Sequence, residues 1–168
     1  MQAMIKWLCL SVISFCLSSL AILISIYTIF SNEQGNMTVI YGAVFWAGFI
    51  AGFVFQIPIQ RKRKRDSRYK RVDKRFLFLR FFRNKPAIVF DILLILGAFI
   101  LVLCTAMFFL KVAVFTVIGN MLTPAAVFAV LLSLEMHCLF NGKNYEYICM
   151  QSTWQYNLRL SQGQQKKK

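Results

Sequence analysis

Long stretches without charge dominate this chain and restrict what it can fold into. The first, residues 7–30, has 24 residues without a charged side chain. As an α-helix it would be about 36 Å long, enough to cross a hydrocarbon core of about 30 Å. Hydrophobic residues make up 58% of the 168 residues, and a soluble domain of this size has too little interior to bury them. We therefore expect an all-α, multi-pass integral protein of the cell membrane.

Four membrane-spanning helices are expected in two hairpins. The hairpins are residues 1–59, with spans 7–30 and 38–59, and residues 87–141, with spans 87–110 and 124–141. The first span follows Lys6 but is too long for a cleaved signal peptide, so an uncleaved anchor is favoured. Thr123 and Pro124 have the pattern of a helix N-terminus, after a turn signal at Gly119-Asn120. Residues 112–122 are also compatible with an interfacial helix or with an extension of the third span.

The distribution of basic residues predicts the orientation. Lys6, thirteen basic residues in 60–86 and five in the tail make nineteen on one side, against Lys111 alone on the other. Basic segments remain on the cytoplasmic side of a membrane. We therefore expect a four-helix bundle with both termini in the cytoplasm, joined by a polybasic cytoplasmic loop at 60–86 and followed by a polar, basic tail at 142–168.

The polybasic loop is the most distinctive element of the sequence. Its second half, residues 75–83, alternates arginines with aromatic residues, which is typical of a segment lying in the membrane interface. The net charge of +14 sits beside the spans, so anionic lipid is the expected partner and nucleic acid is not. The cations expected to contact anionic lipid or an acidic partner are Arg61, Lys62, Arg63, Lys64, Arg65, Arg68, Arg80 and Arg83.

Small residues recur along the first two spans and predict close helix packing. The first span carries them at spacings of three and four, and the second contains a GxxxG pair. Packing within this hairpin is favoured, and a face for another subunit or a second copy is the alternative. The residues are Ser11, Ser14, Ser18, Ala21, Ser25, Gly48 and Gly52.

Three ionisable residues lie within the spans, namely Asp91, Glu135 and His137. They fall at similar depths, so they could form a small polar cluster, but Glu135 and His137 diverge around their helix and only one can face Asp91. The alternative is snorkelling, in which each carboxylate pairs with nearby cations such as Arg80, Arg83 or Lys85. The shallow position favours snorkelling.

No catalytic or metal-binding motif is present in the sequence, and one histidine is a poor basis for either. We therefore expect no enzyme activity, no catalytic residues, no metal and no cofactor. The favoured function is a non-enzymatic accessory or scaffold subunit whose polybasic loop contacts lipid. The alternative is a small oligomeric transporter or channel that uses Asp91, Glu135 and His137 and requires a polar cavity beside them.

Overall fold

The computed structural model describes residues 2–30, 36–69, 75–110 and 115–165, and the regular structure of these residues is helical throughout. Four segments are long and apolar enough to cross a membrane, Gln2–Ile29, Met37–Arg65, Lys85–Met107 and Leu122–Phe140. The expectation of an all-helical chain with four segments able to span a membrane is confirmed. In chain order the elements are α1 (Gln2–Phe30), α2 (Asn36–Val54), α3 (Ile57–Arg65), the single-turn 3₁₀ helix η1 (Leu77–Leu79), α4 (Lys85–Phe109), α5 (Phe115–Phe140) and α6 (Lys143–Gln165).

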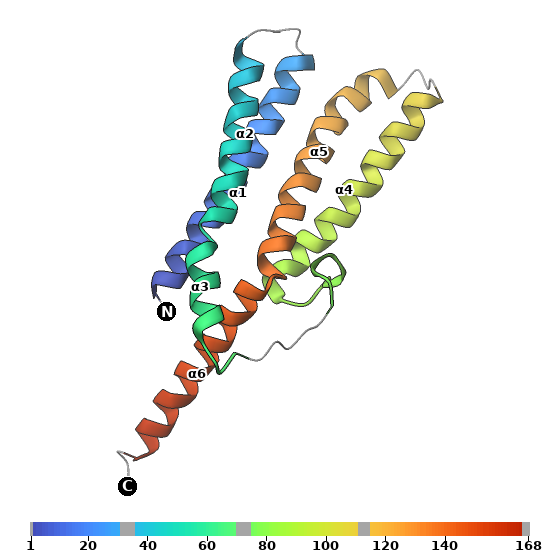
Figure 1. Ribbon diagram of the computed structural model, residues 1–168. Coiled ribbons are helices and arrows are strands. Elements are labelled where there is room, and N and C mark those ends of the chain that lie inside the picture. The colour runs from blue at the N-terminus through green and yellow to red at the C-terminus, as the bar shows by residue number, and fades with distance from the viewer. Residues whose placement is uncertain (1, 31–35, 70–74, 111–114, 166–168) are drawn as a thin grey trace.

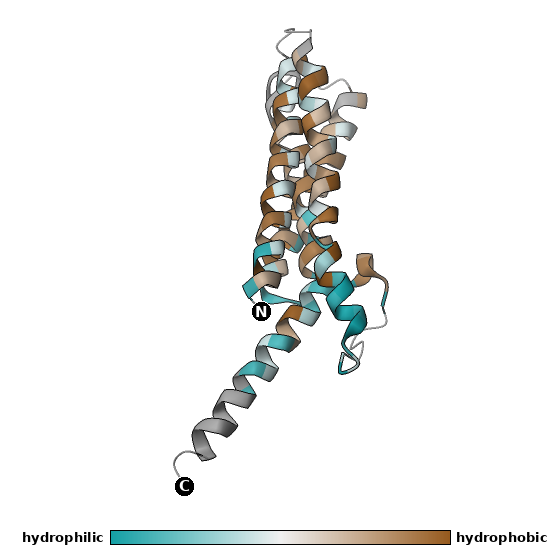
Figure 2. Ribbon diagram, turned by 60° about the vertical axis from the view of Figure 1, so that its left-hand side comes forward, coloured by the Kyte–Doolittle hydropathy of each residue, from teal (hydrophilic) through white to brown (hydrophobic). Residues whose placement is uncertain are grey.

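The helices form two hairpins that meet side by side. α1 packs along α2, α4 packs along α5, and the hairpins join where α1 contacts α5 (Figure 1). The N-terminus, α3, η1 and α6 all lie at the same end of the molecule, which we call the basic end (Figure 1). Figure 2 shows hydrophobic helices above this end and hydrophilic residues gathered at it.

The second span is interrupted near its basic end, which differs from the single helix expected over 38–59. α2 ends at Val54, and α3 begins at Ile57 with Pro58 in its first turn. Proline has no N–H, so the carbonyl of Val54 loses its usual helical partner at this point. The chain then resumes helical structure through the run of lysines and arginines, which are good helix formers.

The helix that contains the fourth span begins earlier than expected, although the apolar segment itself, Leu122–Phe140, agrees with the expected 124–141. α5 starts at Phe115, so Gly119-Asn120 lies within the helix and Pro124 is an internal residue rather than the first one. A proline inside a membrane helix is tolerated because the neighbouring helix and the lipid keep the remaining backbone bonds formed. Residues 112–114 lie outside the described part of the chain.

The small-residue pattern joins α1 to α2. The hydroxyl of Ser11 donates to the carbonyl of Gly52 at 2.6 Å, and the Oγ of Ser18 lies 3.1 Å from the carbonyl oxygen of Phe45. A Cβ at Gly48 would lie 3.0 Å from the carbonyl oxygen of Ser14, and one at Gly52 would collide with the Phe15 ring. The GxxxG face is therefore occupied within the hairpin. Ser11, Ser14, Ser18, Ala21 and Ser25 are all buried.

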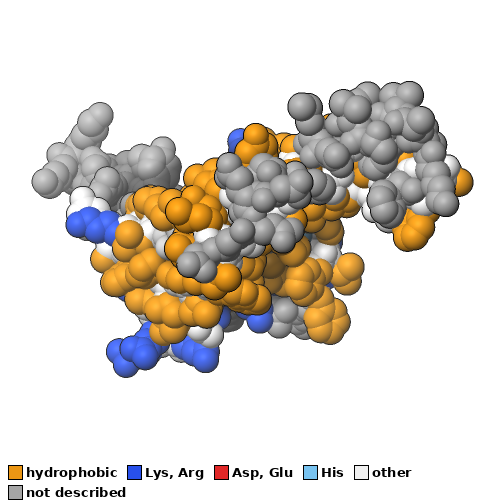
Figure 3. All heavy atoms as spheres, turned by 90° about the horizontal axis from the view of Figure 1, so that it is seen from above, with side chains coloured by type: hydrophobic (Ala, Val, Ile, Leu, Met, Phe, Trp, Pro, Cys, Tyr) orange, Lys and Arg blue, Asp and Glu red, His pale blue; other side chains and the backbone are white. Residues whose placement is uncertain are grey.

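The outer surface of the helices is apolar. Large hydrophobic side chains such as Leu17, Trp46, Val89 and Phe99 are exposed on the four long helices. Figure 3 shows hydrophobic side chains covering much of the face seen from above, with Lys and Arg at its edge. A surface of this composition is suited to contact with lipid chains.

Candidate functional site

Asp91 is the centre of a buried polar cluster at the basic end. It lies in the second turn of α4, and its Oδ1 is 2.7 Å from His137 Nδ1 on α5. Asn141, one turn beyond His137, donates its Nδ2 to both carboxylate oxygens at 3.2 Å. The backbone N–H of Phe82 donates to Oδ2 at 2.6 Å. Asp91, His137 and Asn141 are all at most 1% exposed, so the cluster is closed to solvent.

Both ring nitrogens of His137 have partners in this cluster. Nδ1 lies 2.7 Å from Asp91 Oδ1 and 3.1 Å from Asn141 Nδ2, and Nε2 lies 3.1 Å from the carbonyl oxygen of Leu77. Buried polar groups are tolerated at low cost when they are hydrogen-bonded in this way.

The cluster fastens residues 76–84, here called the aromatic loop, to the ends of α4 and α5. Phe82 has φ of 56°, a left-handed conformation that costs a non-glycine residue about 1–2 kcal/mol. This conformation aims its N–H at Asp91. Asn84 Nδ2 donates to the carbonyl of Phe140 at 2.7 Å, which satisfies a carbonyl at the end of α5. The ring of Phe81 covers His137, with ring centroids 4.6 Å apart.

Arg80 fixes the same loop to the junction of α5 and α6. Its Nη1 donates to the carbonyl of Asn141 at 3.2 Å and lies 3.3 Å from Glu146 Oε2. A cation at this position complements the negative end of the α5 dipole. Arg80 is 1% exposed, so its place differs from the lipid-contacting surface expected for it.

Glu135 belongs to a separate contact between the two hairpins. Its Oε2 accepts from Ser19 at 2.8 Å and its Oε1 accepts from Ser18 at 3.2 Å, both on α1. Of the two candidates on α5, His137 therefore faces Asp91 and Glu135 faces α1. In the part of the chain that the structure describes, Asp91 is hydrogen-bonded to His137, Asn141 and Phe82 rather than to the cations considered for snorkelling.

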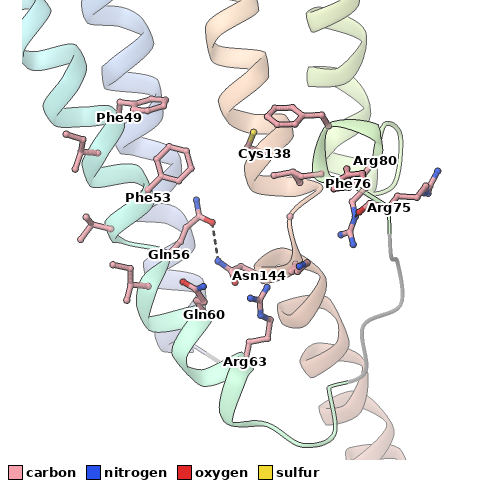
Figure 4. Close-up of a pocket in the computed structure, with 17 residues that line it drawn as sticks. Phe49, Phe53, Gln56, Gln60, Arg63, Arg75, Phe76, Arg80, Cys138 and Asn144 are labelled. Atoms are coloured by element: carbon pink, nitrogen blue, oxygen red, sulfur yellow. Dashed lines mark hydrogen bonds between the residues drawn. The ribbon is translucent and has the colours of Figure 1, made fainter.

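A groove of about 970 Å³ opens between the two hairpins at the basic end (Figure 4). Phe49, Phe53 and their neighbours on α2 form one apolar wall, which continues into α3. The aromatic loop, Cys138 and the start of α6 form the other (Figure 4). Across it, Asn144 Nδ2 donates to Gln56 Oε1 at 3.2 Å. Its lining comprises Phe49, Ile50, Phe53, Val54, Gln56, Ile57, Gln60, Arg63, Arg75, Phe76, Leu77, Phe78, Arg80, Cys138, Gly142, Lys143 and Asn144.

Asp66 attaches the basic helix α3 to α6. It ends α3, and its carboxylate accepts from Tyr147 Oη at 3.1 Å and from Gln151 Nε2 at 2.7 Å, both on α6. Arg68 also donates to it, at 3.1 Å from Nε. The hydrogen bonds from Arg68 are the main reason that the pKa of Asp66 is lowered to about 2. Arg68 in turn lies over the ring of Trp154 at 4.9 Å.

A hydrophobic cluster completes this attachment. Ile59 of α3 packs with Met4 of α1 and with Tyr147 and Ile148 of α6, and all four are buried. Burial raises the pKa of the Tyr147 phenol, and its hydrogen bond to Asp66 adds to this effect. α3 is thus held between α1 and α6 rather than belonging to an irregular loop.

The expected lipid-contacting cations occupy different environments. Arg63 is half-buried at the groove, and its guanidinium carbon lies 6.0 Å from the centre of the Tyr69 ring. The other cations of α3 are exposed. The exposed cations in this set are Arg61, Lys62, Lys64, Arg65, Arg68 and Arg83.

Several important residues were not anticipated from the sequence. Asn141 follows His137 by four positions and so shares its helix face, a spacing that could have identified it. Asp66 stands within a strongly basic run, and its partners Tyr147 and Gln151 are 81 and 85 residues away, so no local pattern indicates the contact.

Comparison with protein-family models, curated proteins and solved structures finds no match for this chain.

Proposed function

We propose that this protein is a non-enzymatic, multi-pass subunit of the cell membrane whose basic end lies on the cytoplasmic side and attracts anionic lipid. The observation that carries the proposal is the attachment of α3. Asp66 and the Ile59 cluster hold this helix against α6 and α1, so its exposed cations keep a fixed outward direction. A fixed row of cations attracts a negatively charged leaflet by roughly 1 kcal/mol for each cation near the surface.

The aromatic loop supports the same placement. Phe76, Phe78 and Leu79 expose 63–80% of their surfaces, although the loop backbone is fixed by Asp91 and Arg80. Exposed rings beside arginines are suited to the boundary between acyl chains and headgroups. Both termini would then be cytoplasmic, because α1 begins and α6 extends at this end (Figure 1).

A transporter or channel using Asp91, Glu135 and His137 is less well supported. Such a protein needs water or substrate to reach these groups, yet they are 0–4% exposed and none of them lines the groove. Each also has its polar atoms engaged by partners that serve packing, namely the aromatic loop and the serines of α1. These packing contacts support the proposed scaffold role.

The lipid proposal is tested with the full-length protein reconstituted into bilayers. Spin-labelled phosphatidylglycerol and phosphatidylcholine report, by electron paramagnetic resonance, the relative affinity of each lipid for the protein surface. We expect the wild type to prefer phosphatidylglycerol, with the preference reduced at high salt because screening weakens exposed charges. Replacing Arg61, Lys62, Lys64 and Arg65 by Gln should reduce the preference severalfold. An unchanged preference would exclude α3 as the lipid-contacting surface.

The orientation is tested separately. In a cysteine-free background, Ser67→Cys places one exposed thiol just after α3. A membrane-impermeant maleimide should label it only after the cells are permeabilised. Labelling of intact cells would place the basic end outside and refute the proposed topology.

A further inference from the structure

We propose that the groove between the hairpins is a binding site for one anionic phospholipid, with its phosphate at the basic mouth and an acyl chain along the aromatic wall. This inference rests on the proposed placement of the basic end at an anionic leaflet. It goes further by distinguishing one defined site from the diffuse attraction of the exposed cations of α3.

Along its length the lining of the groove changes from apolar to basic, as a phospholipid changes from acyl chain to charged headgroup. Phe49, Ile50 and Phe53 line it on α2, while Arg63 lies at its other limit near the end of α3. Phe49 and Arg63 are fourteen residues apart, about 20 Å along a helical path. Since half of the hydrocarbon core is about 15 Å thick, a groove of this length extends from within the core into the headgroup layer.

Charge complementarity specifies an anionic headgroup. The described residues that line the groove include four cations and no acidic residue, and one of the four, Arg80, is paired with Glu146 outside the lining. The four are Arg63, Arg75, Arg80 and Lys143. Guanidinium groups suit phosphate because they present several N–H donors in one plane. The volume of about 970 Å³ lies at the upper end of the 300–1,000 Å³ typical of ligand pockets, as a headgroup with part of a chain requires.

The depth of the groove favours a lipid over an acidic peptide. An extended peptide inserted along Phe49 and Phe53 would leave its own backbone groups unpaired in an apolar environment, which costs several kcal/mol for each group. An acyl chain has no such groups. Lipid is also present at the groove at high effective concentration because the protein is embedded in it.

The headgroup contact is tested with two pairs of substitutions that remove the same charge. Arg63→Gln with Lys143→Gln alters the groove, whereas Lys62→Gln with Lys64→Gln alters exposed cations outside it. Native mass spectrometry of the full-length protein, titrated with phosphatidylglycerol or phosphatidylcholine, measures the affinity of the first bound lipid. We expect the groove pair to weaken phosphatidylglycerol binding roughly tenfold to thirtyfold and the exposed pair to weaken it less than threefold. Arg63→Lys with Lys143 unchanged should retain most of the affinity.

The acyl contact is tested with two matched insertions on α2. Ile50→Trp fills the groove, and Val44→Trp adds the same bulk to an exposed position that does not line it. Only Ile50→Trp should weaken phosphatidylglycerol binding. An Ile50→Trp protein that binds as tightly as the wild type would exclude the chain-binding part of the proposal.

The outcomes separate the two proposals. Equal weakening by both charge pairs would overturn the groove site and leave the diffuse attraction of the basic end in place. No weakening by either pair would overturn both. Equal affinity of the wild type for the two lipids would also overturn the site, because its cations would then have no selective role.

Discussion

Replacing Asp91 with Ala should release the aromatic loop from the ends of α4 and α5. In the closed state Asp91 accepts the N–H of Phe82 at 2.6 Å, and this bond is lost whenever the loop opens. Its bonds to His137 and Asn141 join α4 to α5 instead, so their loss affects the open and closed states alike. The strain at Phe82 is likewise released on opening in both proteins. The substitution therefore changes the opening equilibrium mainly through the one hydrogen bond from the loop to the Asp91 side chain.

The expected change in the open fraction follows from the free energy of this one hydrogen bond. A hydrogen bond contributes about 0.5–1.5 kcal/mol, and about 1.5–3 kcal/mol when one partner is charged. At about 1.4 kcal/mol for each factor of ten, the open fraction should rise roughly 2- to 150-fold. Asp91→Asn retains an amide oxygen that can accept from Phe82, so it should give a smaller increase.

Limited trypsin digestion in lipid nanodiscs reports the opening. Arg80 is 1% exposed when the loop is closed, whereas Arg61 and Lys62 are exposed in all states. The ratio of cleavage after Arg80 to cleavage within α3, measured by mass spectrometry, follows the open fraction when reclosing is faster than cleavage. This ratio is internal to each protein and is independent of expression level.

Glu135→Ala is the matched control. It also removes a buried carboxyl group, but the partners of Glu135 are Ser18 and Ser19 on α1 rather than the aromatic loop. The cleavage ratio should stay within twofold of the wild type. A ratio unchanged in Asp91→Ala would show that the carboxylate does not hold the loop.

Two further predictions concern other contacts. Gly52→Ala should destabilise the α1–α2 hairpin by about 1–3 kcal/mol in a detergent unfolding titration, because the new methyl group meets the buried Phe15 ring, whereas Gly42→Ala, with nothing within 4 Å, should be nearly neutral. The contact of Asp66 with α6 should persist across physiological pH, because the pKa of Asp66 is lowered to about 2 in the folded protein, so its contribution is complete above the ordinary value near 3.8 and is lost as pH falls through 2. Fluorescence of Trp154, in a variant with the other tryptophans replaced, should therefore change only below about pH 4, and a transition near neutrality would contradict this assignment.

The spans could be predicted from the sequence because length and hydropathy are sufficient to identify them. The residues at which the helices begin and end could not be predicted in this way. Thr123-Pro124 has the local pattern of a helix start, yet α5 begins at Phe115, because a membrane helix that packs along α4 remains favourable despite one missing backbone bond. Likewise, the span expected over 38–59 gives no indication that α2 ends at Val54 or that a separate helix, α3, begins just before Pro58.

The candidate polar cluster was partly predictable. The similar depths of Asp91 and His137 follow from counting residues along two antiparallel helices. The choice of His137 over Glu135 depends on the rotation of α5 about its axis, which its contacts with α1 and α4 determine. The aromatic loop's own contribution, through Phe82 and Leu77, uses backbone groups and therefore has no signature in side-chain chemistry.

The partners of Asp91 also have a consequence for biosynthesis. The cluster needs Phe82 from the loop, Asp91 from α4, and His137 and Asn141 from the end of α5. A nascent chain that has emerged only as far as α4 lacks the last two. The bond from Phe82 to Asp91 can form as soon as α4 exists, whereas the bonds that hold the aromatic loop to the end of α5, made by Arg80, Asn84 and Leu77, can form only after α5 has been made.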